Sequence, residues 1–149
     1  AEVRNRTLGF VFQAHYLLPE CTAMENVLMP YVISHRKPDR DVLAWADELF
    51  ELIGISRVKN NPATKMSGGQ QQRTAIVRAL INKPRVVLAD EPTGNLDSEN
   101  TANIYKRFRE VNERYGTTFI IVTHDRRIAE QTDRIIEVRD GRVLLDINK

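Results

Sequence analysis

Short, continuous apolar runs along the chain predict β-strands. Continuous runs are typical of strands in a parallel sheet, because helices cover both faces of such a sheet. The last two runs flank Asp140-Gly141, a dipeptide typical of a tight turn, and predict a hairpin. The expected strands are 7–12, 86–89, 118–123, 134–139 and 143–147.

Between these runs, apolar residues recur every three or four positions, which predicts helices. Thr22 and Glu25 have the T-x-x-E spacing of a capping box, while Gly54, Pro84 and Gly116 mark helix ends. The expected helices begin at Thr22, run from about Asp39 to Ile53, and cover 70–82 and 98–115. Trp45 and Phe50 lie within the second helix and are expected in its core.

The composition is that of an ordinary globular domain, with 149 residues, 42% of them apolar and 28% charged. The net charge is only +2 and no basic block occurs, so we expect no nucleic-acid partner. The single cysteine, Cys21, cannot form an internal disulfide, and no apolar run approaches the length of a membrane span. A reducing, cytoplasmic location is expected.

Polar side chains follow the predicted strands at the edge where parallel sheets bind ligands. Asp90 and Glu91 end the run 86–89, and Gln13 follows 7–12. Two adjacent carboxylates resist joint ionisation unless a cation or a proton-transfer role stabilises them. Taken alone, the pair could equally be solvated acids entering a loop, and an isolated Gln13 is more often a polar residue at a strand end.

Ser67, Gly68 and Gly69 precede the helix 70–82. A capping hydroxyl and two residues without side chains allow backbone N–H groups to approach an anion at the positive end of the helix. This turn suits a phosphate. By itself, such a sequence is more often a simple helix cap.

The motifs together resemble those of ATP-binding-cassette (ABC) ATPases. MSGGQQQR at 66–73 is similar to the signature motif, VVLADEP at 86–92 to the Walker B strand, and NLD at 95–97 to the D-loop. FVFQ, ending at Gln13, resembles the Q-loop, and THD around His124 resembles the H-loop. The resemblance implies an α/β fold of the P-loop NTPase type, with a mainly parallel sheet flanked by helices and a helical subdomain.

The resemblance also implies ATP and Mg²⁺ as cofactors and roles for individual residues. Asp90 and Gln13 would hold the magnesium ion, and Glu91 would accept a proton from the attacking water or orient it. His124 would bridge the terminal phosphate, the water and Glu91, a task that suits a compact donor and acceptor. The implied catalytic residues are Glu91, His124 and Gln13.

Other residues would act across a dimer, because two subunits of this family sandwich two ATP molecules head to tail. The signature residues Ser67, Gly68, Gly69 and Gln70 would contact the nucleotide held by a second, identical subunit. Asn95, Leu96 and Asp97 would form the D-loop at the dimer interface. The helical subdomain would contact integral membrane subunits, which places the ATPase peripherally on the inner face of the cytoplasmic membrane.

The resemblance divides the chain into residues 14–65, mostly the helical subdomain, and residues 1–13 and 66–149, a RecA-like core. The Walker A loop, G-x-x-x-x-G-K-[ST], is absent from the sequence, since none of its seven glycines has that spacing. In the family this loop and an antiparallel subdomain lie upstream of the glutamine strand. The chain therefore resembles the C-terminal two-thirds of a cassette.

In that family the Walker A strand lies between strands equivalent to 118–123 and 134–139, so a gap is expected there. Unpaired N–H and C=O groups at such a gap are costly. We expect the chain to pair with another copy, to slide its C-terminal strand inward, or else to be poorly folded alone.

Within the family, ADEPTGNLD and the segment FQAHYLLPECTAMENVLMP resemble ATPases of lipoprotein-releasing and related exporters. Two alternatives stay open. A chromosome-maintenance or repair ATPase shares three of the motifs, but those proteins carry long insertions and only 52 residues separate Gln13 from Met66. A non-catalytic, partner-binding module is favoured by the missing Walker A loop and opposed by the presence of Glu91 and His124.

Overall fold

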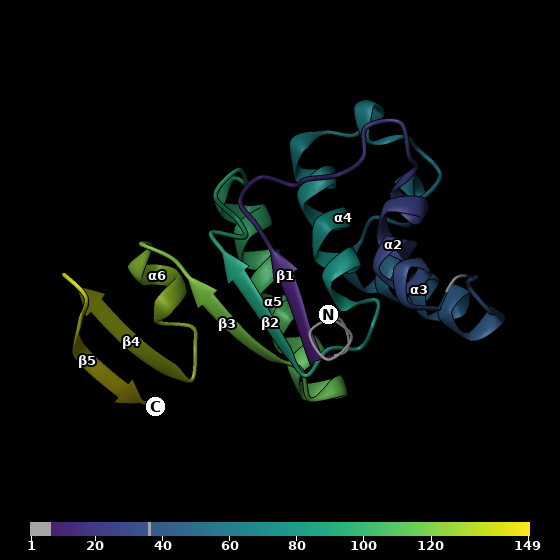
Figure 1. The fold of residues 1–149 in the computed structure, drawn as a ribbon. Coiled ribbons are helices and arrows are strands. Elements are labelled where there is room, and N and C mark those ends of the chain that lie inside the picture. The colour runs from purple at the N-terminus through teal and green to yellow at the C-terminus, as the bar shows by residue number, and fades with distance from the viewer. Residues whose placement is uncertain (1–6, 36) are drawn as a thin grey trace.

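The computed structural model describes residues 7–35 and 37–149. Strands and helices alternate along the chain as expected for an α/β fold (Figure 1). The strands are β1 (Leu8–Val11), β2 (Val86–Asp90), β3 (Thr118–Val122), β4 (Arg134–Arg139) and β5 (Arg142–Asn148). The helices are α2 (Ala23–His35), α3 (Arg40–Ile53), α4 (Gly68–Leu80), α5 (Ser98–Tyr115) and α6 (Arg126–Ala129), with 3-10 turns η1 (Ser56–Val58) and η2 (Ala63–Lys65).

The sequence did not predict α6 or the two 3-10 turns, because each is too short to show a hydrophobic period. Local hydrogen bonds explain α6. The Asp125 carboxylate caps it by accepting the backbone N–H of Arg127. In the described part of the chain, none of the helices combines the length and apolar character that crossing a bilayer requires.

β1, β2 and β3 form a parallel sheet in that order, which confirms the predicted parallel arrangement. Val11 lies beside Ala89 on β2, and Ala89 lies beside Ile121 on β3. Asp90 in turn lies beside Val122. The carboxyl ends of all the strands in this sheet therefore meet at one edge.

The expectation that this sheet is covered on both faces is wrong for β3. On one face Val11, Val87 and Ala89 are at most 1% exposed. On the other face Ile120 and Val122 on β3 remain 51% and 61% exposed. The physical reason is that α5 packs on the first face, where Phe108 stacks on Phe119, whereas among the described residues nothing covers the second face of β3.

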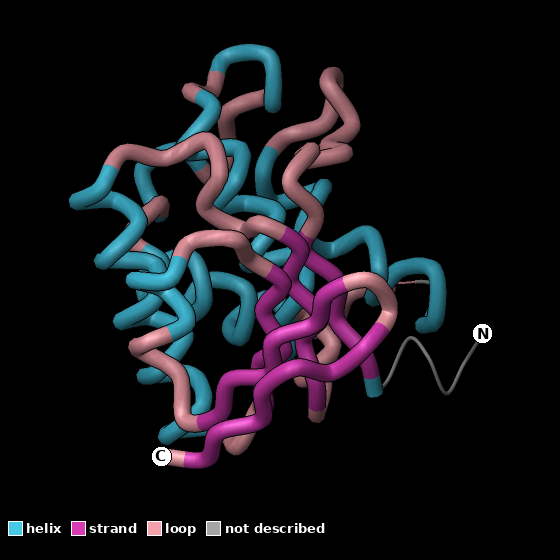
Figure 2. Tube along the Cα trace, turned by 90° about the vertical axis from the view of Figure 1, so that its left-hand side faces the viewer, coloured by secondary structure: helices cyan, strands magenta, loops and turns pink. Residues whose placement is uncertain are grey.

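β4 and β5 form a separate antiparallel hairpin rather than extending the sheet. Figure 2 looks onto this hairpin, with the parallel strands behind it. β4 does not pair with β3, so the inward slide of the C-terminal strand is not what the chain does. Ile136 and Val138 on β4 are 51% and 63% exposed, like the facing strand β3. Pairing with another copy stays a prediction.

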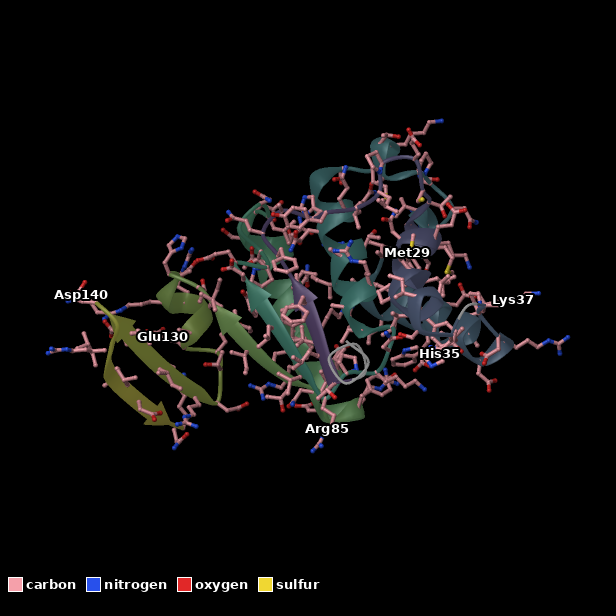
Figure 3. The ribbon with its side chains drawn as sticks, in the orientation of Figure 1. Met29, His35, Lys37, Arg85, Glu130 and Asp140 are labelled. Atoms are coloured by element: carbon pink, nitrogen blue, oxygen red, sulfur yellow. The ribbon has the colours of Figure 1, made fainter. Side chains whose placement is uncertain are left out.

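The helices α2, α3 and α4 pack together beside the sheet, with α4 lying between β1 and the other two (Figure 1). Phe50 is fully buried and Trp45 is 8% exposed, so both are core residues as predicted. The predicted Thr22–Glu25 capping box is present at the start of α2. In Figure 3, Met29 and His35 mark α2, while Arg85 marks the amino-terminal edge of the sheet.

One hydrophobic core extends from the helices into the sheet, joining Val27 and Phe50 to Val87 and Phe108. The sequence-derived boundaries at 14–65 and 66–149 therefore do not separate independent cores. The assignment of these ranges to two subdomains stays a prediction.

Gly9 sets how closely β1 approaches α4. A Cβ atom at this position would lie 2.4 Å from the Ala79 carbonyl oxygen and 3.2 Å from Pro84 Cγ. Since the nearer atom belongs to the helix backbone, it cannot move aside as a flexible side chain would. Gly9 is therefore required by packing.

We predict that Gly9→Ala lowers the free energy of unfolding by about 1–3 kcal/mol, because it forces β1 away from α4. Gly68→Ala is the matched control, since a Cβ there meets nothing within 4 Å. Calorimetric unfolding of both variants measures the difference. Equal stability of the two variants would contradict this account of Gly9.

Candidate functional site

The candidate site lies at the carboxyl edge of the parallel sheet (Figure 1). Gln13 follows β1, Asp90 ends β2, Glu91 comes directly after it, and His124 follows β3. The strand order therefore gathers at one edge four residues that are far apart in the sequence.

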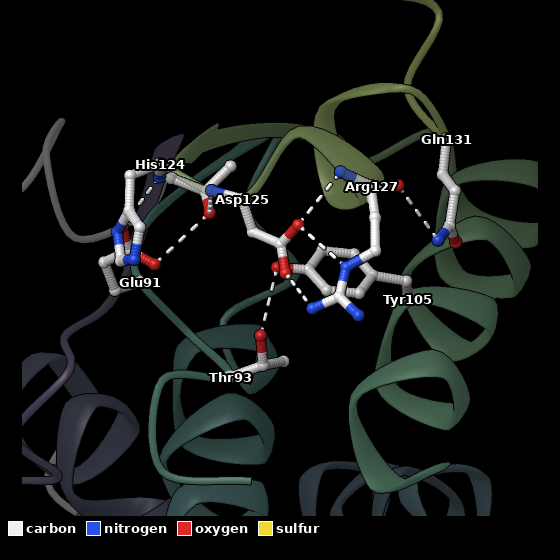
Figure 4. Close-up of polar contacts among 8 residues, drawn as sticks. Glu91, Thr93, Tyr105, His124, Asp125, Arg127 and Gln131 are labelled. Carbon is white, nitrogen blue, oxygen red and sulfur yellow. Dashed lines mark hydrogen bonds and ion pairs between the residues drawn. The ribbon is translucent and has the colours of Figure 1, made fainter. Parts of the chain in front are cut away.

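Glu91 and His124 are in direct contact (Figure 4). His124 Nδ1 lies 2.6 Å from Glu91 Oε1, and the His124 backbone N–H donates to the same oxygen at 2.9 Å. Thr123 Oγ1 donates to Glu91 Oε2 at 3.2 Å. The Glu91 side chain is 20% exposed, whereas that of His124 is 92% exposed. The carboxylate is therefore fixed in place while the imidazole faces outward.

The backbone of Glu91 adopts φ 43°, in the left-handed region that non-glycine residues rarely occupy. Two backbone hydrogen bonds hold it there, from its N–H to Val122 O at 2.9 Å and from the Gly94 N–H to its carbonyl at 3.0 Å. Such a conformation costs about 1–3 kcal/mol and tends to cluster at functional sites. The turn directs the Glu91 side chain toward β3 rather than along β2.

Gln13 lies against the turn that follows Glu91. A Cβ atom on Gly94 would come within 3.1 Å of Gln13 Nε2 and 3.4 Å of the Glu91 carbonyl oxygen. Asn95 Nδ2 donates to the Gln13 carbonyl oxygen at 3.2 Å. The structure thus brings together Gln13, Glu91 and the predicted D-loop residue Asn95.

Asp90 is exposed at the end of β2. Its carboxylate and the amide of Gln13, which follows the adjacent strand β1, offer the oxygen ligands that Mg²⁺ prefers. Among the described residues no group of three or more His, Cys, Asp or Glu side chains could hold a metal ion. Asp90 and Gln13 are the residues that would hold a magnesium ion at this edge, and their oxygen atoms suit such an ion.

The signature turn caps α4 as the sequence predicts. Ser67 Oγ accepts the Gln70 backbone N–H at 3.3 Å, and Gln70 Oε1 accepts the Ser67 N–H at 2.9 Å. The side-chain oxygen of Gln70 is thus engaged within the turn. Gly68 and Gly69 have no positive φ, and a Cβ on Gly68 meets nothing.

The open space at Gly68 is informative, because glycine in a helix costs about 1 kcal/mol relative to alanine. Neither conformation nor packing within the chain requires glycine at this position. A surface on which another molecule approaches the backbone closely provides a reason for it.

The predicted D-loop packs against the signature turn. A Cβ on Gly69 would lie 3.1 Å from Leu96 Cδ2. Asp97 caps α5 by accepting the Asn100 backbone N–H at 2.8 Å, and this bond holds the pKa of the Asp97 carboxyl below its usual value. Asn100 also accepts a hydrogen bond from Arg73 on α4. The two motifs are therefore linked by packing and by polar contacts.

A second group of polar residues lies next to Glu91 (Figure 4). Thr93 and Tyr105 share a hydrogen bond of 3.3 Å, and burial raises the pKa of the Tyr105 phenol. Asp125 forms an ion pair with Arg127 at 2.8 Å, and this partner holds the pKa of the Asp125 carboxyl low. These contacts support the loops on which Glu91 and His124 lie.

Sequence reasoning missed Gln72 and Arg78 on α4. Gln72 is 1% exposed and bonded to residues of two loops at the site. Arg78 donates to the carbonyl oxygens of His15 and Tyr16 at 2.8 and 2.7 Å. A signal for Gln72 was available, since it shares the helical spacing of the apolar stripe at Ala75, Ile76, Ala79 and Leu80.

Comparison with known proteins defines the class to which the fold and the site belong. The family model described as ABC transporter matches residues 1–94, so the chain belongs to the ABC transporter family. Within it, the chain is 50% identical over 141 residues to "Lipoprotein-releasing system ATP-binding protein LolD 1" of Rhodopseudomonas palustris. It is 49% identical over 146 residues to the LolD protein of Anaeromyxobacter dehalogenans.

These alignments cover 95% and 98% of this chain but only 62% and 61% of the two relatives. The chain thus spans about three-fifths of the length of the curated relatives it matches. Solved structures lead to the same conclusion about the family. The dimeric bacterial ABC transporter cassette MJ0796 is 39% identical with a TM-score of 0.87, covering 99% of this chain and 65% of that one.

A further solved structure, cbiO1 from Clostridium perfringens, is 30% identical with a TM-score of 0.88, covering 99% of this chain and 59% of that one. It is described as part of the ABC transporter complex cbiONQ. The P-loop NTPase-like fold predicted from the sequence is therefore confirmed.

We predict that the 149-residue chain alone binds ATP weakly or not at all. The sequence lacks the glycine-rich loop and lysine that would hold the phosphates, and the outer face of β3 is exposed. Isothermal calorimetry with Mg-ATP measures this directly. Tight, magnesium-dependent binding by the isolated chain would show the reasoning to be wrong.

A second prediction concerns the signature turn in a form of the protein that carries a Walker A loop upstream of residue 1, here called the Walker A-containing form. Ser67→Arg or Gly69→Asp should abolish ATP hydrolysis, because bulk or negative charge blocks the approach of phosphate. Nucleotide affinity of a single subunit should change less than about threefold, since its own phosphate site is elsewhere.

Hydrolysis assays and calorimetry at protein concentrations that keep the subunits apart separate the two effects. Asn103→Arg, at an exposed position farther along α5, is a control for added charge. A parallel loss of single-subunit affinity would contradict action across a dimer.

Proposed function

We propose that this chain is the part of an ABC transporter ATPase subunit that activates water and contacts the nucleotide of a partner subunit. The proposal is carried by the contact between Glu91 and His124, with their side-chain atoms 2.6 Å apart at the carboxyl edge of the sheet. Phosphoryl transfer to water depends chiefly on positioning and on charge stabilisation, which this edge provides.

Glu91 acts on the attacking water as general base or orienting group. Its carboxylate is held by Thr123 and by the backbone and imidazole of His124, so it need not reorganise during the reaction. The imidazole of His124 is 92% exposed, so the proposal leaves it open to a terminal phosphate. The Gln13 amide lies beside Gly94, in the turn that follows Glu91.

Asp90 and Gln13 are the residues that would hold magnesium. When bound, the ion neutralises charge that develops on the phosphate oxygens. Asp90 itself supplies a hard, negatively charged oxygen, and Gln13 supplies a neutral one. In this proposal Asp90 is a ligand of magnesium, and Glu91 accepts the proton of the attacking water.

The open turn at Ser67–Gly69 supports binding of a phosphate held by another subunit. Gly68 and Gly69 carry no side chains of their own at the start of α4, and a Cβ on Gly68 would meet nothing within 4 Å. The cassette MJ0796 was solved as a dimer, and also as a post-hydrolysis dimer bound to ADP and Pi. We propose the same use of a homodimer here, with Asn95, Leu96 and Asp97 at its interface.

The lipoprotein-releasing branch is supported by the two LolD relatives near 50% identity. We propose that the Walker A-containing form energises lipoprotein release or related export from the inner face of the cytoplasmic membrane. Residues 14–65 would contact the integral membrane subunits. Transport activity in a reconstituted system with those subunits tests the branch assignment separately from ATP hydrolysis.

A non-catalytic role in binding a partner is the second candidate. It is favoured by the absence of a Walker A sequence among these 149 residues. The hydrogen-bonded Glu91–His124 pair argues against this role. The positive φ of Glu91 costs free energy of folding, and a non-catalytic protein would have no chemical use for it.

In the Walker A-containing form, we predict that Glu91→Gln reduces steady-state hydrolysis by at least about 100-fold, because the variant cannot accept a proton. ATP binding should persist, since Asp90 and Gln13 are unchanged, and the dimer should become trapped with nucleotide. Phosphate release assays and gel filtration with ATP measure both effects.

Glu130→Gln is the matched control, an exposed glutamate at the end of α6. It should hydrolyse ATP at the normal rate. Retention of steady-state hydrolysis in Glu91→Gln would exclude Glu91 as the catalytic group.

A further inference from the structure

Gln72 is a buried polar side chain on α4, one helical turn beyond Gly69 of the signature turn. Its exposed fraction is 1%, and it is among the largest fully buried side chains of the described chain. A buried amide is costly unless its donors and acceptor are satisfied. The partners of Gln72 are therefore informative.

The partners lie in two loops of the candidate site. Gln72 Nε2 donates to the Pro92 carbonyl oxygen at 2.6 Å and, over a longer 3.5 Å, to the Phe12 carbonyl oxygen. Gln72 Oε1 lies 2.5 Å from His15 Nδ1. Pro92 directly follows Glu91, and Phe12 directly precedes Gln13.

We propose that Gln72 is a positioning residue that fixes the Gln13 and Glu91 loops relative to each other and to the signature turn. The inference rests on the proposed ATPase function. One amide group on α4 bonds next to Gln13 and next to Glu91, two of the residues proposed to act on the nucleotide of the same subunit. The same helix begins with the turn that contacts the nucleotide of the partner.

The position of Glu91 makes this support necessary. Its backbone is held at φ 43°, a conformation that relaxes unless neighbouring contacts maintain it. The bond from Gln72 to Pro92 is short and buried on both sides. It ties the peptide that follows Glu91 to a helix packed on β1 and α2.

The loop that carries His15 is itself attached to α4. Arg78, near the C-terminal end of the same helix, donates to the carbonyl oxygens of His15 and Tyr16. The loop after β1 is thus bound to α4 by two side chains, and Gln72 also hydrogen-bonds to the loop after β2. Movement of α4 would consequently reach Gln13 and Glu91 together.

The test uses the Walker A-containing form with Gln72→Met and Gln72→Glu. Methionine keeps the length of the side chain and removes the amide, while glutamate keeps an acceptor toward His15 and removes the donor to Pro92. We expect kcat for ATP hydrolysis to fall about 10- to 100-fold in both, because small displacements of reacting groups cost this much. KM should stay within about threefold.

Asn26→Leu is the matched control. Asn26 is 2% exposed, and its amide donates to the carbonyl oxygens of Leu18, Cys21 and Thr22, away from Gln13 and Glu91. The Asn26→Leu variant should lose about as much stability as the Gln72 variants, while its kcat changes less than about threefold. An equal fall of kcat in Asn26→Leu and the Gln72 variants would overturn the proposal.

Hydrogen exchange provides a readout that does not depend on hydrolysis. Gln72→Met should increase backbone exchange at residues 12–16 and 91–95, whereas Asn26→Leu should increase it near residues 18–26. If the unsubstituted protein hydrolyses no ATP, the proposed function fails and exchange alone decides the role of Gln72. Unchanged exchange in both loops would overturn the positioning role.

Discussion

Parallel pairing of β1, β2 and β3 is the constraint on which the candidate site depends. Parallel strands place their carboxyl ends at one edge, so Gln13, Glu91 and His124 meet although more than a hundred residues separate the first from the last. The register places Asp90 beside Val122, and the Glu91 N–H then bonds to Val122 O. Without this parallel pairing, the three residues would not lie close together.

Helix α4 connects the loops at this edge to one another. Its first turn holds the open signature glycines, its middle bonds to the loops after β1 and β2, and its far end packs against Gly9. This one helix therefore carries the signature turn and bonds to the residues next to Gln13 and Glu91. Helices propagate displacement along their length, so α4 is suited to link subunits.

The sequence predicted the main elements, the parallel sheet and the edge at which its polar residues gather, because continuous apolar runs and polar residues after strands are strong signals. The family motifs predicted which residues would gather. Burial of β3 was predicted wrongly, since burial depends on which neighbour covers a strand and not on the strand's own sequence. The helical spacing of Gln72 indicated that it faces the core, but the partners of its amide lie about 20 and 60 residues away, and spacing does not reveal them.

The left-handed backbone conformation of Glu91 lowers the stability of the fold, while the side chain at this same position is needed for the proposed chemistry. Glycine or asparagine would relieve the strain, and a selection for thermal stability alone would favour either of them. Both would remove the carboxylate that bonds to His124. A stabilised variant obtained without an activity screen would thus tend to lose this glutamate first.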